Sequence, residues 1–111
     1  MKQVDFVRRA GEVLDGLFEQ IESQLGDLLE VDLEGGILTI ELPDGATYIV
    51  NKHAPNREIW LSSPKSGVWH FASGAEGWRS TRPGPAGPVD FPAVLADELA
   101  AASGRSVALT V

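Results

Sequence analysis

The sequence predicts an α+β fold, a two-layer α–β sandwich with the order helix, antiparallel sheet of five to six strands, helix. Apolar residues recur every three or four positions near both ends of the chain and alternate with polar residues in between. The turns between the alternating segments are short, which makes neighbouring strands antiparallel. With 111 residues, 43% of them hydrophobic, the chain fits one domain over residues 1–111.

The first expected element is an amphipathic helix over about residues 4–25. Its apolar positions fall on one face: Phe6, Ala10, Val13, Leu14, Leu17, Ile21 and Leu28. Its acidic positions fall on the opposite arc: Asp5, Glu12, Asp15, Glu19 and Glu22. Glycines at 11, 16 and 26 lower the intrinsic helix propensity, so we expect tertiary packing to stabilise the helix.

A hydrophobic period of two then predicts a series of strands. Val31 and Leu33 alternate with acids over residues 30–34, and Gly35-Gly36 supplies a hairpin turn to a second strand that contains residues 38–42. Further strands are expected at residues 47–52, 57–62, 68–72 and, as a short sixth strand, 78–81.

The last part of the chain predicts a loop, a helix and a tail. The Pro-Gly run at 83–88 is typical of an exposed loop. Asp90 can cap a second helix over about residues 91–103, with Pro92 in its first turn and Gly104 at its end. Val107, Leu109 and Val111 then belong to an extended tail.

Acidic residues are concentrated at the front of the chain. Residues 1–44 hold 11 of the 16 acids and 3 bases, a net charge of −8, whereas residues 45–111 hold 5 acids and 6 bases, a net charge of +1. Such an asymmetry produces a negative surface that repels nucleic acid and attracts cations or a basic partner.

The outward acids of the helix continue through the connection into the first strand. We call this set the acidic ridge: Glu12, Asp15, Glu19, Glu22, Asp27, Glu30, Asp32 and Glu34. One interpretation is a solvated helix face. However, acids near a helix C-terminus oppose the helix dipole, a local cost that favours a functional role. Carboxylate oxygens on an open surface predict weak and exchangeable cation binding.

A second candidate surface is aromatic. Strand alternation places Trp60 with Glu58 on the face of the sheet that points away from the helices, and it places Asn51 and His70 there as well. An exposed tryptophan among polar neighbours is typical of a partner-binding surface. The alternative is that Trp60 lies buried under the Pro-Gly loop or the tail.

Several classes of function are excluded or disfavoured by composition. The chain has no cysteine, which removes disulfides, thiolate metal sites and cysteine-ligated clusters, and it has only two histidines. No G-x-S-x-G motif, phosphate-binding glycine loop or dinucleotide motif is present. No apolar run reaches the length of a membrane span, and the first residues resemble neither a secretory nor a transit segment, so we expect a cytoplasmic protein.

The middle of the chain carries a specific motif. Asn51-Lys52, five residues, and Ile59-Trp60-Leu61 are followed by Ser-Ser-Pro-Lys-Ser-Gly at 62–67 and by an aromatic triplet at 69–71. This stretch resembles the signature of the frataxin family, and the match in order and spacing covers about residues 5–103. The resemblance implies the frataxin fold, which agrees with the order of elements above.

The resemblance also implies a role in iron–sulfur cluster assembly. Frataxins bind iron through acids of the first helix and first strand, and they dock on the complex of cysteine desulfurase and scaffold protein. Four acids match by position, Glu19, Glu22, Glu30 and Asp32, with Glu12, Asp15, Asp27 and Glu34 nearby. The partner-binding residues that match are Asn51 and Trp60, and less firmly Glu58 and His70.

Two departures from the family pattern concern the iron ligands and a loop. Phe18 and Ser23 stand where bacterial relatives often have acids, and the Pro-Gly loop is longer than usual.

The predicted function is a non-enzymatic iron chaperone or regulator of cluster assembly that binds Fe²⁺ or Fe³⁺ without an organic cofactor. The alternatives are a ferroxidase and an iron store. We expect a monomer, with iron-dependent oligomers as the sign of storage.

Overall fold

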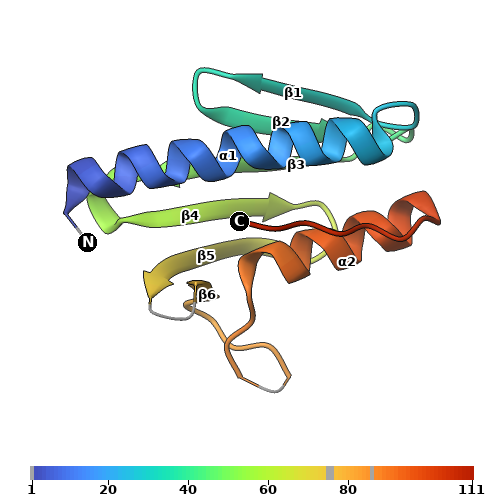
Figure 1. Ribbon diagram of the computed structural model, residues 1–111. Helices are drawn as coiled ribbons and strands as arrows, with labels where there is room; N and C mark the ends of the chain where they lie inside the picture. The colour runs from blue at the N-terminus through green and yellow to red at the C-terminus, as the bar shows by residue number, and fades with distance from the viewer. Residues whose placement is uncertain (1, 75–76, 86) are drawn as a thin grey trace.

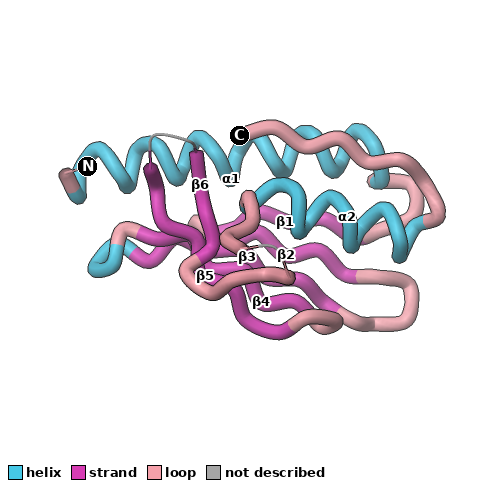
Figure 2. The backbone as a smooth tube through the Cα atoms, turned by 90° about the horizontal axis from the view of Figure 1, so that it is seen from below, coloured by secondary structure: helices cyan, strands magenta, loops and turns pink. Residues whose placement is uncertain are grey.

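The structure is a computed structural model that describes residues 2–74, 77–85 and 87–111. Two helices, α1 (Gln3–Leu25) and α2 (Phe91–Ser103), pack on one face of a six-stranded sheet (Figures 1 and 2). The strands are β1 (Glu30–Glu34), β2 (Ile37–Glu41), β3 (Thr47–His53), β4 (Glu58–Ser63), β5 (Gly67–Gly74) and β6 (Gly77–Ser80). The predicted two-layer sandwich is confirmed.

The sheet is an antiparallel meander with the strand order β1-β2-β3-β4-β5-β6. Its first turn consists of Gly35 and Gly36, whose φ angles of 59° and 76° suit the tight hairpin that joins β1 to β2. This turn places Glu34 opposite Ile37 and so fixes the register of the whole hairpin. Among the described residues, no helix is long and apolar enough to cross a membrane.

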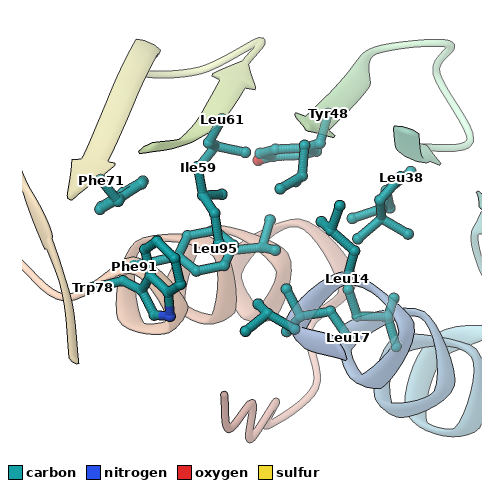
Figure 3. Packing of buried hydrophobic residues seen from close by; sticks show 14 of the residues in the cluster. Leu14, Leu17, Leu38, Tyr48, Ile59, Leu61, Phe71, Trp78, Phe91 and Leu95 are labelled. Atoms are coloured by element: carbon teal, nitrogen blue, oxygen red, sulfur yellow. The ribbon is translucent and has the colours of Figure 1, made fainter. Parts of the chain in front are cut away.

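The core fills the space between the helices and the inner face of the sheet (Figure 3). The expected apolar face of α1 is buried from Phe6 to Ile21, but Leu28 was assigned to it wrongly and is 40% exposed. The helix ends at Leu25, whose carbonyl oxygen accepts bonds from the amides of both Leu28 and Leu29. This turn breaks the helical period, and Leu25 and Leu29 are buried instead.

Helix α2 begins and ends where the sequence predicted. Asp90 stands at the N-cap position, but its side chain makes no capping hydrogen bond. Its carboxylate lies 3.4 Å from Nε of Arg79 in β6, an ion pair that replaces the expected capping role. Gly104 ends the helix in the left-handed conformation with φ of 72°.

A polar cluster joins the middle of α2 to the sheet. The half-buried carboxylate of Glu98 accepts hydrogen bonds from the Tyr48 hydroxyl at 3.1 Å, from Ser63 Oγ at 2.6 Å and from Ser66 Oγ at 2.5 Å. Ser66 Oγ in turn accepts a bond from Nε1 of Trp69 at 2.8 Å. One carboxylate therefore ties α2 to β3, to the end of β4 and to the turn before β5.

The C-terminal tail, residues 105–111, lies along α1 (Figure 1). Gln24 donates to the carbonyl of Ala108 at 2.8 Å and accepts from its amide at 3.0 Å. Gln20 makes the same pair of bonds to Thr110, at 2.9 and 2.8 Å. Two glutamines one turn apart thus bind alternate residues of an extended chain, as a neighbouring strand would.

Candidate functional site

The acidic ridge lies on α1 and β1, which pack against each other at one edge of the sandwich (Figure 1). On α1 the four ridge carboxylates are exposed because the opposite face of the helix is buried. On β1 the residues alternate, so Val31 and Leu33 are half-buried while Glu30, Asp32 and Glu34 are exposed. The edge strand therefore presents a row of carboxylates to solvent.

Two ridge residues already have cationic partners. Glu12 lies 3.3 Å from Arg8 in an exposed pair on α1. Asp27 accepts hydrogen bonds from both terminal guanidinium nitrogens of Arg105, at 2.8 and 2.7 Å. The hydrogen bonds from Arg105 lower the pKa of the Asp27 carboxyl below its usual value. Arg105 also donates to the carbonyl of Gln24 at 3.1 Å, which supplies a positive charge to a helix whose last turn has no basic residue.

Glu41 is a further candidate that sequence reasoning missed. The β1–β2 register places it directly opposite Glu30, and like charges in that position repel each other. Both line a pocket of about 290 Å³ at the end of α1, which Asp27 also lines. The two-residue turn at Gly35 and Gly36 could have revealed this pair, because it sets the register of the hairpin.

The carboxylates of the ridge are spread rather than gathered. In residues 2–74, 77–85 and 87–111, no three Asp, Glu, His or Cys side chains lie close enough together to hold one metal ion. What the structure provides is a series of exposed oxygen ligands on α1 and β1, and a polar pocket where the two elements meet.

Trp60 lies on the outer face of the sheet, as predicted, and is half-buried. Its indole stacks between two imidazoles, with centroid distances of 3.9 Å to His53 and 4.2 Å to His70 and interplanar angles of 9°. Its Nε1 donates to Glu58 at 2.9 Å. The tail packs against α1 on the other side of the sheet and does not cover this tryptophan.

His53 lies one residue beyond the strand expected at 47–52, and in the structure it is the last residue of β3. Alternation from Asn51 would have placed it on the outer face, in the row where it pairs with Glu58. The register also places Trp60 opposite both Asn51 and His70. All four partner-binding candidates therefore lie together with His53, and we call these five residues the Trp60 face.

Exposed apolar side chains adjoin the Trp60 face on the outer surface of the sheet. Ile37, Ile49 and Val68 are 46%, 40% and 57% exposed on β2, β3 and β5. Ile37 pairs with Asn51, and Ile49 and Val68 both pair with Ser62, so the three lie on adjoining cross-strand rows. An exposed group of large apolar residues beside an aromatic cluster is typical of a protein-binding surface.

Comparisons with known proteins agree on one family. A family model described as a frataxin-like domain matches residues 1–105. A protein of Neisseria meningitidis serogroup B named iron-sulfur cluster assembly protein CyaY is 41% identical over 110 residues, covering 96% of this chain and 94% of that protein. The mitochondrial frataxin homolog of Saccharomyces cerevisiae is 40% identical over 72 residues, covering 65% and 41% of the two chains.

Solved structures show the same fold. Frataxin from Psychromonas ingrahamii superimposes with a TM-score of 0.84 at 23% identity, over 100% of both chains. Trimeric yeast frataxin, in a crystal structure described as complexed with ferrous, has a TM-score of 0.76 at 32% identity over 86% of each chain.

Proposed function

The chain belongs to the frataxin family, and from this premise we propose that it is an iron-binding protein of iron–sulfur cluster assembly. It would act as an iron chaperone and regulator of the complex between cysteine desulfurase and scaffold protein. The observation that carries the proposal is that the protein has two distinct surfaces. The exposed carboxylates lie on α1 and the edge strand β1, and the aromatic Trp60 face lies on the outer face of the sheet.

The acidic ridge is proposed to bind Fe²⁺ or Fe³⁺ weakly and exchangeably. Its ligands are carboxylate oxygens, which suit hard cations, and their exposure leaves water to complete the coordination shell. Such a site needs no organic cofactor. It also favours delivery over storage, because an ion that keeps water ligands can be passed on.

The same carboxylates suit a basic surface on the desulfurase, whereas the Trp60 face suits the scaffold protein. The two surfaces differ in chemistry, since one is charged and the other is aromatic and apolar. We propose that both are used at once, with the protein monomeric until it meets the assembly complex. A cytoplasmic location stays a prediction.

The ferroxidase alternative is not favoured. Di-iron oxidases hold their metals in a buried cage of carboxylates and histidines on facing helices. Here the ridge carboxylates are exposed, and both histidines stack on Trp60 on the outer face of the sheet. Oxygen uptake after addition of Fe²⁺ would equal that of a buffer blank.

Neutralising three ridge carboxylates should weaken binding of both iron and the desulfurase. In the variant Glu19→Gln, Glu22→Gln, Asp32→Asn we expect at least a tenfold loss of affinity for each, because every charge removed contributes about 0.5 kcal/mol or more. Anaerobic calorimetry with Fe²⁺ and a desulfurase binding assay at low salt measure the two effects.

The matched control is the variant Asp5→Asn, Asp44→Asn, Asp97→Asn. It has the same net charge and should change either affinity by less than about twofold. Equal losses in both variants would contradict the assignment to the ridge.

Removing the indole of Trp60 should weaken binding to the desulfurase–scaffold complex and leave iron binding unchanged. For Trp60→Ala we expect the affinity for the desulfurase–scaffold complex to fall at least 30-fold, since a central aromatic anchor contributes about 2 kcal/mol or more. Iron affinity should not change, because the ridge is intact. Val4→Ser, which removes an apolar side chain that is 73% exposed at the start of α1, serves as the control. Full retention of affinity in Trp60→Ala would rule out the Trp60 face as the docking surface.

A further inference from the structure

Arg105 connects the C-terminal tail to the acidic end of α1. Its guanidinium binds both oxygens of Asp27, and a third bond reaches the carbonyl of Gln24. A bidentate pair of this kind is the strongest common form of carboxylate–arginine contact. Arg105 stands 78 residues away from Asp27 in the sequence, so the contact exists only in the folded chain.

The contact is one of three polar contacts that fasten the tail to α1, and Val107 and Leu109 of the tail also pack against the core. The other two polar contacts are the paired bonds from Gln24 to Ala108 and from Gln20 to Thr110. Gln24 takes part twice, since its side chain binds the tail and its carbonyl accepts from Arg105. Loss of Arg105 from Asp27 therefore removes the anchor that lies between the end of α2 and the next bonds, at Ala108.

Asp27 also belongs to the polar pocket that Glu30 and Glu41 line. Glu30 and Glu41 face each other across the β1–β2 hairpin, and neither has a cationic partner among the described residues. Asp27, which lines the same pocket, is paired with the guanidinium of Arg105. A guanidinium and a metal ion compete for the same carboxylate, because both bind its oxygens and their positive charges repel each other at that distance.

We infer that Arg105 is an intramolecular competitor for cations at the end of the acidic ridge, so that docking of the tail and binding of a cation oppose each other. The inference rests on the proposed iron binding, whose regulation it describes. A cation that binds Asp27 displaces Arg105 and loosens the tail. By thermodynamic reciprocity, docking of the tail lowers the affinity for the cation by the same factor.

The variant Arg105→Gln tests the first half of this coupling. We expect its affinity for Fe²⁺ under anaerobic conditions to rise about fivefold over the unmodified protein, the size of effect that an exposed ion pair can exert. Arg9→Gln is the matched control. It removes the same charge from the exposed face of α1, far from Asp27, and should raise the affinity by less than about twofold. Equal gains in the two variants would reduce the effect to general electrostatics and overturn the inference.

The tail supplies a second measurement that does not depend on affinity. Deuterium uptake of residues 105–111 should increase when Fe²⁺ is added to the unmodified protein. In Arg105→Gln it should be raised already and change little with Fe²⁺. In Asp27→Asn the tail should also be loosened, but without the gain in affinity, because a ligand has been lost together with the competitor.

The outcomes separate this inference from the proposed function. If Fe²⁺ fails to bind any of the variants or the unmodified protein, the iron proposal fails and the inference falls with it. If Fe²⁺ binds the unmodified protein while Arg105→Gln matches Arg9→Gln and the tail stays protected, iron binding stands and the competition is overturned.

Discussion

Replacing Glu98 with alanine is expected to lower the free energy of unfolding by about 3 kcal/mol. Its carboxylate accepts hydrogen bonds from the hydroxyls of Tyr48, Ser63 and Ser66, and the Tyr48 side chain is buried, with 1% exposed. Hydrogen bonds to a charged acceptor contribute about 1.5–3 kcal/mol each, and their loss leaves buried donors without a partner. Urea unfolding followed by tryptophan fluorescence measures the change.

Two further variants show whether hydrogen bonding causes the loss. Glu98→Gln keeps the size and one oxygen acceptor, so it should lose about half as much as the alanine variant. Asp97→Ala alters the neighbouring, exposed residue of α2 and should change the free energy of unfolding by less than about 0.5 kcal/mol. A loss below about 1 kcal/mol in Glu98→Ala would mean that the cluster is not a major source of stability.

The Glu98 cluster also bears on the proposed partner surface. Ser63 ends β4 and Ser66 lies in the turn before β5, and these strands carry Trp60 and His70 on their outer faces. The cluster fixes the inner side of the same two strands that present the Trp60 face. Stability of the core and geometry of the docking surface are therefore linked through β4 and β5, although the two lie on opposite faces of the sheet.

The sequence was most informative where a pattern is local. Hydrophobic periods predicted α1, α2 and the strands to within a few residues, and alternation placed Trp60 on the outer face. Leu28 was misplaced because a helical period says nothing about where the helix ends. Asp90 was expected to cap α2, but a cross-strand partner, Arg79, attracted its carboxylate instead.

Features that depend on distant segments could not be predicted from the sequence. The acids near the end of α1 oppose the helix dipole, and the pattern gave no sign that Arg105 would return from the far end of the chain to neutralise Asp27. Likewise, strand alternation showed that Trp60 faces outward. It did not show that imidazoles from β3 and β5 cover both faces of its ring, since that depends on the sheet register.

Alkaline pH should destabilise the fold through Tyr48. Burial raises the pKa of its hydroxyl to about 12, and the nearby charge of Glu98 adds to the shift. In the unfolded chain the phenol has its ordinary value, 10.0. The fold therefore favours the protonated phenol, so this contribution is complete below pH 10 and is lost as pH rises toward 12. A two-unit difference corresponds to about 2–3 kcal/mol of stability.

The chain contains one tyrosine, which makes the test direct, because tyrosinate absorbance during an alkaline titration reports Tyr48 alone. Absorbance should rise with a midpoint near 12 in the folded protein, and near 10 in urea. Tyr48→Phe lacks the titrating group, so its free energy of unfolding should not show the loss between pH 10 and 12, although it starts about 1 kcal/mol lower for want of the bond to Glu98. A folded-state midpoint near 10, or an equal alkaline loss in the phenylalanine variant, would show that the Tyr48–Glu98 contact does not set the stability of this protein at high pH.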